Sequence, residues 1–200
     1  TGGADGRLTI DDRRPGGRRT RAWLLDEGEA GDTYDHCPPA NQRLDEGLAP
    51  AGRWRLIESG PTRVTAELTG RWRLPVGLSA DRQQRRATRR AVPLRLRLSL
   101  SAGTPRLDLE LELDNRVDDH RLRLGVEAPF AAEEWLATGP FELAARPTAT
   151  ASHPDWHQLP APTQPFAGLA ALADRAGGLA LLAPGLREIE PRRRVASTQL

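Results

Sequence analysis

The sequence contains no lysine and no methionine, and only one of its 200 residues is cysteine. A single thiol excludes a disulfide framework and any metal site built from several thiolates. No segment approaches the roughly 18 consecutive apolar residues of a membrane-spanning helix. The chain also starts without a signal peptide. We therefore expect no membrane partner. Together with a composition typical of GC-rich bacterial genes, these features predict a cytoplasmic bacterial protein.

Positive charge comes from arginine alone, and it is almost balanced by acidic residues. The 29 basic residues face 27 acidic ones, for a net charge of +2. So small a net charge produces no large positive field, and we expect no nucleic-acid partner. The length fits one large domain or two small ones, at about 150 residues per domain. Because the chain opens with Thr1 and lacks methionine, we expect a segment of a longer polypeptide.

Leucine alternates with charged residues between positions 92 and 127. Alternation with period two predicts half-buried strands rather than a helix. A turn at residues 102–105 places Leu98 opposite Leu109 and Arg97 opposite Glu110, and a second reversal at residues 115–119 places Leu113 opposite Leu122. The result is an antiparallel meander whose strands are basic, acidic and basic, so that opposite charges face each other. Four charged side chains should share its solvent-facing side: Arg97, Glu110, Glu112 and Arg123.

Further apolar segments separated by glycine and proline indicate more strands. We expect them at residues 7–13, 21–26, 53–59, 63–74, 178–182 and 186–190. A short exposed helix is compatible with residues 79–91, and a single helical turn with residues 169–175. Long loops are expected at residues 28–50 and at the Pro-rich residues 144–165. The pattern predicts one all-β domain over residues 1–200, a large antiparallel sandwich with an Arg-rich loop or insertion at 79–91.

The loop at residues 31–39 holds the densest cluster of reactive side chains. The cluster consists of Asp32, Tyr34, Asp35, His36 and Cys37. One interpretation is a polar site whose carboxylates accept hydrogen bonds from ligand hydroxyls or from a neighbouring domain. The other is an Asx-turn loop whose carboxylates bond to their own backbone. Neighbours in one loop are not the separated acid pair of a glycosidase, so we predict no catalytic residue here.

Two further motifs are weaker candidates. His153 and His157 have a spacing that binds zinc on a helix, but Pro154 prevents that helix, and we predict no metal ligand. Trp156 between them is a candidate for stacking on a sugar ring, although a partly buried loop tryptophan is more common. The arginines at residues 82–90 have no interleaved aromatic residue, which favours a solvated loop over a phosphate-binding surface.

Several segments in order resemble one enzyme family. They are Asp5–Asp12, Glu29–Asp35 with Pro38 and Pro39, Glu58–Val64, Thr104–Asp108, Leu113–Arg116, Asp119–Arg123, Pro162–Pro165, and Gly178–Leu182 with Gly185 and Leu186. The chain resembles the β-sandwich region downstream of the catalytic domain in glycoside hydrolase family 38, the α-mannosidases. Two features depart from the family pattern: Gln164 stands where histidine is expected after Thr163, and the chain ends at Leu200 where further strands are expected.

The resemblance implies a large β-supersandwich related to galactose-mutarotase-like folds. It also implies that the nucleophilic aspartate and the zinc-binding histidine and aspartate residues lie in an upstream catalytic domain. Zinc, or another divalent metal, would then be a cofactor of the parent enzyme, with α-mannosides as its substrates. The upstream catalytic domain would be the partner of this chain, which alone would be inactive.

Three hypotheses follow. The first is an accessory domain of a retaining α-mannosidase that lends loops to the rim of the catalytic cleft. The second is a stand-alone carbohydrate-binding or structural module, against which the low aromatic content of 4% argues. The third and weakest is a mutarotase-like enzyme that uses a loop histidine and an acid.

Overall fold

The computed structural model describes residues 7–14, 16–32, 36–47, 52–149, 155, 161–175, 177–192 and 195–199. Within these ranges the chain forms fifteen β-strands and no helix. The paired strands with residue-by-residue registers are antiparallel. The predicted all-β, antiparallel fold class is therefore confirmed. No helix in the described ranges is long and apolar enough to cross a membrane.

The chain divides into two compact units. The first unit comprises Thr1–Leu25 and Leu122–Leu200, and the second comprises Asp26–Arg121. The assignment of all 200 residues to one sandwich domain stays a prediction.

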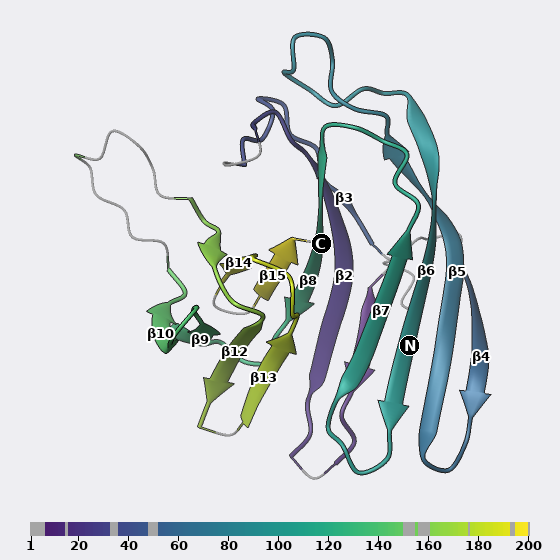
Figure 1. The fold of residues 1–200 in the computed structure, drawn as a ribbon, viewed down its shortest axis with the longest axis vertical. Helices are drawn as coiled ribbons and strands as arrows, with labels where there is room; N and C mark the ends of the chain where they lie inside the picture. Colours follow the sequence, from purple (N-terminus) through teal and green to yellow (C-terminus); the bar gives the residue numbers. More distant parts are fainter. Residues whose placement is uncertain are drawn as a thin grey trace. The chain divides into compact units, whose positions relative to one another are not determined.

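A four-stranded sheet in the order β4-β5-β6-β7 forms the second unit's main element (Figure 1). Its strands are β4 (Arg53–Ser59), β5 (Arg63–Pro75), β6 (Arg89–Ser101) and β7 (Leu107–Leu113). Leu98 pairs with Leu109 and Arg97 with Glu110, as the alternation and the turn predict. In that turn Gly103 has φ of 77°, a left-handed conformation that glycine adopts without steric cost.

Charged side chains bind one another on one face of this sheet. The Glu67 carboxylate is almost buried and accepts hydrogen bonds from Arg55 (2.9 Å) and Arg97 (3.0 Å). These two hydrogen bonds lower the pKa of Glu67 below its ordinary value. Arg95 also binds Glu112 on the neighbouring strand, through Nε at 3.0 Å. The alternation therefore predicted both the face and the cross-strand partners of the β6–β7 pair.

The third strand of the predicted meander lies elsewhere. β8 (His120–Glu127) does not follow β7 in the same sheet but lies between β2 (Arg19–Gly28) and β15 (Val195–Gln199). Arg123, expected in solvent, is buried and binds Glu190 and Ser197. Burial raises the pKa of Glu190, but the charges and hydrogen bonds of Arg123 and Arg192 together outweigh burial and lower that pKa. The sequence pattern predicted that Arg123 would face solvent, whereas in the structure it pairs with buried Glu190, which is distant in sequence.

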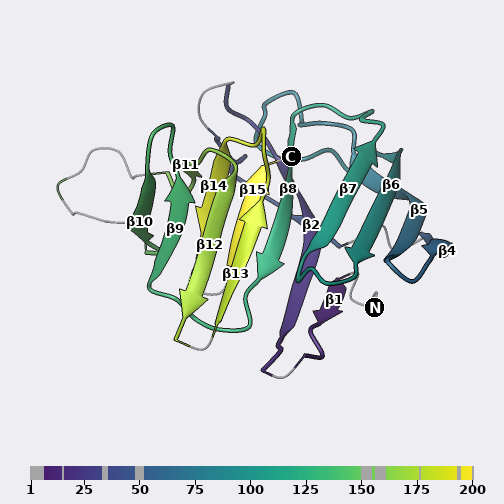
Figure 2. The same cartoon turned by 60° about the horizontal axis from the view of Figure 1, so that its bottom comes forward.

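The other two sheets meet in the core of the first unit (Figure 2). One has the order β1-β2-β8-β15-β14-β11, with β3 beside β2, and the other has the order β10-β9-β12-β13. The bounds not yet given are β1 (Leu8–Asp11), β3 (Asp45–Glu46), β9 (Glu134–Thr138), β10 (Leu143–Pro147), β11 (Gln164–Pro165), β12 (Leu169–Asp174), β13 (Gly177–Leu182) and β14 (Glu188–Pro191). Phe130, Trp135, Phe166, Leu172 and Ile189 are among the buried residues of this core.

Gly125 has a steric role within β8. A Cβ atom at this position would lie 2.8 Å from the Trp23 indole and 2.9 Å from Leu25 Cδ1. Both distances are too short for a side chain, so glycine lets Trp23 lie against the β8 backbone.

Three segment assignments need correction. Residues 169–175 are not a helical turn, because Leu169–Asp174 forms strand β12, whose first four residues alternate between partly and fully buried positions. The segment 79–91 is not a helix, and it ends earlier than expected because β6 begins at Arg89. The Pro-rich segment 144–165 is not wholly a loop, since its first residues belong to β10, which pairs with β9.

Candidate functional site

Strand β2 ends in two consecutive carboxylates, Asp26 and Glu27, and both are buried. Successive side chains of a strand point to opposite faces, so the two carboxylates serve different surroundings. Asp26 Oδ1 lies 2.6 Å from His120 Nδ1, and Asp26 Oδ2 accepts a hydrogen bond from Arg85. Glu27 Oε1 lies 3.8 Å from His36 Nε2 and 3.8 Å from Arg121 Nε. The strand end thus organises two polar networks of the second unit.

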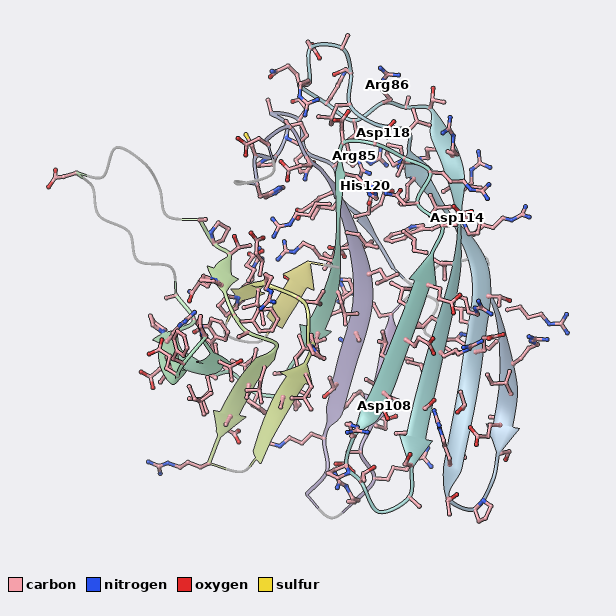
Figure 3. All side chains as sticks on the ribbon, viewed as in Figure 1. Arg85, Arg86, Asp108, Asp114, Asp118 and His120 are labelled. Carbon is pink, nitrogen blue, oxygen red and sulfur yellow. The ribbon has the colours of Figure 1, made fainter. Side chains whose placement is uncertain are left out.

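Arg85 links the Asp26 network to strand β3. Its Nη1 donates to the Asp26 carbonyl oxygen (3.0 Å) and to Asp45 Oδ2 (3.2 Å), and Arg89 donates to Asp45 Oδ1 (2.8 Å). Only 5% of the Arg85 side chain is exposed. The interpretation of residues 79–91 as a solvated loop is therefore wrong for Arg85, which Figure 3 labels together with His120.

His120 has an acceptor at each ring nitrogen. Its Nε2 lies 3.1 Å from the Asn115 side-chain oxygen, and that same oxygen accepts the amide N–H of Val117 at 3.1 Å. The bond to Val117 fixes which end of the Asn115 amide faces the histidine. Asp26 Oδ1 at the other ring nitrogen, Nδ1, completes the contacts of the imidazole. The network is thus a buried, hydrogen-bonded structural element, without an exposed reacting group.

Residues 29–32 and 36–37, the Glu29 loop, meet at the Glu29 carboxylate. Glu29 Oε1 accepts the amide N–H groups of Gly31 (2.8 Å) and Cys37 (2.9 Å), and Oε2 binds His36 Nδ1. The amide of Ala30 also donates to the Cys37 carbonyl oxygen at 2.7 Å. Burial raises the pKa of Glu29, but these hydrogen bonds outweigh it and hold that pKa below 4.5. An ionised Glu29 therefore fixes both ends of the loop.

The sequence-predicted site residues fall into two groups. Asp32 is exposed on the loop, and His36 turns toward Glu29 with 17% of its side chain exposed. Tyr34, Asp35 and Trp156 lie outside the described residues, as do His153 and His157. Sequence reasoning missed Glu29 as the organising group. An acid and a histidine at the two ends of one polar loop were the available signal.

The hydrogen bonds of Glu29 predict a pH dependence. Because the folded-state pKa lies below 4.5, ionised Glu29 contributes stability above that pH, and this contribution is lost as the pH falls through the lowered pKa. We expect Glu29→Gln to reduce the free energy of unfolding at about pH 6 and to differ less from wild type at about pH 3. Urea unfolding at both pH values measures this difference. A gap that stays constant or widens in acid would contradict the role of Glu29.

The acidic and histidine side chains of these networks do not form a metal site. Within the described ranges, no group of three or more histidine, cysteine, aspartate or glutamate side chains has an arrangement that could hold a metal ion. The residues present there do not fit zinc.

Solved structures share this arrangement of strands. The crystal structure of an α-mannosidase from Enterococcus faecalis V583 matches with a TM-score of 0.88 and 20% identity, covering 100% of this chain and 24% of that one. A glycosyl hydrolase family 38 protein from Enterococcus faecalis matches with a TM-score of 0.85 and 19% identity, covering 100% and 25%. This chain has the fold of a part of these proteins.

The match to these two structures confirms the fold that the family resemblance implies, an antiparallel all-β region of a family 38 protein. The chain spans about a quarter of the length of the α-mannosidase and of the family 38 protein. No family model matches the sequence, and no curated protein matches it. In this α-mannosidase fold, the Glu29 loop and the Asp26 network both belong to the second unit.

Proposed function

We propose that this chain is an accessory β domain of a family 38 α-mannosidase, which packs on the catalytic domain and shapes its cleft. The observation that carries the proposal is the fold match over the whole chain, against only a quarter of the α-mannosidase. In this proposal the catalytic carboxylates and the zinc, or another divalent metal, belong to the upstream catalytic domain. No catalytic step is assigned to the residues of this chain.

Apolar side chains on β4 support a contact with another part of the polypeptide. β4 is an edge strand of its sheet, and Trp54, Leu56 and Ile57 are 37%, 62% and 45% exposed. Adjacent exposed apolar residues on a strand edge are typical of an interaction surface. We infer that this edge packs on the catalytic domain.

The Glu29 loop supports a role at the rim of the cleft. Glu29 fixes the two ends of the loop, while Asp32 remains exposed between them. A carboxylate on a fixed loop suits hydrogen bonding to sugar hydroxyls or to a neighbouring domain. Tyr34, Asp35, His36 and Trp156 are the other candidates for these contacts.

Hydrolysis of an aryl α-mannoside tests whether catalysis belongs to the upstream catalytic domain and not to this chain. The longer polypeptide that contains these residues should hydrolyse the substrate with added zinc, whereas the 200-residue chain should not, because it offers no separated acid and nucleophile. Circular dichroism of the chain provides the control for folding. Turnover by the chain itself would contradict the accessory role. An inactive but folded longer polypeptide that binds mannosides would favour the stand-alone binding module.

Asp32→Asn in the longer polypeptide tests the loop. We expect kcat/KM for an α-mannoside to fall about ten- to a hundredfold, because a hydrogen bond to a charged group contributes roughly 1.5–3 kcal/mol. Tyr34→Phe should act in the same direction. The melting temperature should stay nearly constant, since Asp32 is exposed. Asp114→Asn, a charge-matched change at another exposed position, is the control. Wild-type kinetics in Asp32→Asn and Tyr34→Phe would reduce the loop to a structural turn.

A further inference from the structure

A polar cavity of about 680 Å³ lies within the second unit, between residues 41–45 and the connection from β5 to β6. Its lining includes Asn41, Arg43, Asp45, Ser79, Arg86 and Arg89. We propose that this cavity binds a small oxyanion, the phosphate or carboxylate group of a low-molecular-weight ligand. The volume falls in the range of small-molecule sites, roughly 300–1,000 Å³.

Three of the residues that line the cavity are linked by ion pairs, those of Asp45 with Arg85 and with Arg89. Asp45 accepts hydrogen bonds from Arg85 at 3.2 Å and from Arg89 at 2.8 Å, so its negative charge is shared by two guanidinium groups. Arg85 also binds Asp26, and Arg89 donates to the carbonyl oxygen of Arg73 at 2.7 Å. These two arginines are therefore neutralised and fixed in position, and they serve as structure rather than as the binding groups.

Arg43 and Arg86 provide donors that are still free. Arg86 Nε donates to the Leu78 carbonyl oxygen at 2.7 Å, while its two terminal nitrogens have no hydrogen-bond partner in the described part of the chain. Arg43 is exposed, and its guanidinium likewise has no partner among the described residues. Figure 3 labels Arg86 and Arg85, which both lie on the connection between β5 and β6. Two arginines whose terminal nitrogens have no partner among the described residues thus belong to the lining of the same cavity.

This charge pattern selects the ligand class. A guanidinium group offers planar pairs of N–H donors that match carboxylate and phosphate oxygens, and such charge-assisted bonds are among the stronger hydrogen bonds in proteins. The near-neutral chain and the absence of aromatic residues between 79 and 91 argue against a single-stranded nucleic acid. A compact anion fits better than a polymer.

Hydrogen bonds within the protein fix the connection between β5 and β6, which carries Arg86. Ser79 N–H donates to the Gln84 carbonyl oxygen at 2.8 Å, and Arg86 N–H donates to Gly77 at 2.9 Å. Arg82 Nη1 donates to Asp119 Oδ1 at 3.0 Å. A preformed cavity avoids part of the ordering cost of binding.

Isothermal titration of the full chain with inorganic phosphate, and separately with citrate, tests the proposal. We expect saturable binding that weakens with salt, and a dissociation constant about tenfold or more higher in Arg43→Gln and in Arg86→Gln. Arg71→Gln, which removes an exposed arginine from β5, should bind as wild type. Tighter binding of phosphate would assign a phosphate ligand, and tighter binding of citrate a carboxylate ligand.

Several results of the titration would overturn the oxyanion site. Absence of binding by both anions, or wild-type binding by both cavity variants, would overturn the proposal. So would equal loss in Arg71→Gln, which would indicate a general charge effect. Binding of a short DNA duplex in preference to both anions would replace the small-molecule ligand by a nucleic acid. Arg43 contacts Arg85 only through its backbone carbonyl oxygen, and its exposed side chain has no hydrogen-bond partner among the described residues, so Arg43→Gln remains informative even if Arg86→Gln does not fold. The measurement does not depend on mannosidase activity, so it stands or falls separately from the proposed function.

Discussion

Asp26→Asn is expected to lower the free energy of unfolding by about 3–5 kcal/mol, the usual cost of leaving a buried charge without its partner. Asp26 is fully buried, its Oδ1 lies 2.6 Å from His120 Nδ1, and its Oδ2 accepts a hydrogen bond from the Arg85 guanidinium. Asparagine has the same shape, but it keeps only one acceptor oxygen. With the amide in either orientation, the negative charge that pairs with the Arg85 guanidinium is lost.

Urea unfolding followed by circular dichroism measures the Asp26 effect, with Asp114→Asn as the matched control. Asp114 pairs with Arg116 at the surface, where solvent screens both charges. The control should therefore unfold close to wild type. Equal unfolding midpoints for the two variants would show that the Asp26 network contributes little to stability.

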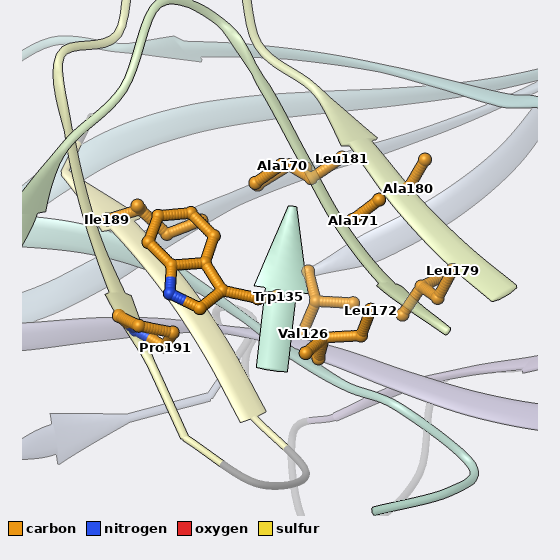
Figure 4. Close-up of a pocket in the computed structure, with 10 residues that line it drawn as sticks. All are labelled: Val126, Trp135, Ala170, Ala171, Leu172, Leu179, Ala180, Leu181, Ile189 and Pro191. Carbon is orange, nitrogen blue, oxygen red and sulfur yellow. The ribbon is translucent and has the colours of Figure 1, made fainter. Parts of the chain in front are cut away.

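Trp135→Ala is expected to lower the free energy of unfolding by about 3–5 kcal/mol, the usual range for a large aromatic side chain removed from a core. Trp135 is only 2% exposed and belongs to the core between the two sheets of the first unit. Figure 4 shows its indole beside Ile189 and Pro191. A cavity of about 40 Å³ already lies against it. Truncation would enlarge this space, and the surrounding strands cannot close it without losing their register.

Trp135→Phe separates the packing of the ring from its polar group. The indole Nε1 is buried and has no hydrogen-bond partner in the described part of the chain. Phenylalanine therefore sacrifices no hydrogen bond and retains most of the apolar contact, so its cost should be much smaller than that of alanine. Equal destabilisation by the two variants would mean that the packing around the ring does not determine the stability.

The local sequence pattern predicted the pairing of β6 with β7 correctly, but it did not predict the position of β8. Between Arg97 and Glu110, the alternation, the turn and the charges all favour one register, and the structure has it. β8 shows the same alternation of leucine and arginine, yet both of its faces are buried in its middle. The difference arises from Glu190, which lies 67 residues beyond Arg123. Alternation specifies opposite faces, but it does not show which face meets water.

The candidate sites show the same limit. The cluster at residues 31–39 was recognisable from its composition, whereas the role of Glu29 depends on backbone amides that only the folded loop directs at one carboxylate. Arg85 belongs to a basic segment that looks solvated in sequence. Its partners Asp26 and Asp45 lie 59 and 40 residues away, so no local window contains them.

The position of Cys37 makes the Glu29 loop accessible to spectroscopy. Its thiol is exposed, and its backbone N–H and carbonyl oxygen both take part in closing the loop. As the sequence has no second cysteine, a maleimide fluorophore would attach to the native chain at one place without engineered mutations. The anisotropy of the fluorophore would report the tumbling of this segment in the 200-residue chain.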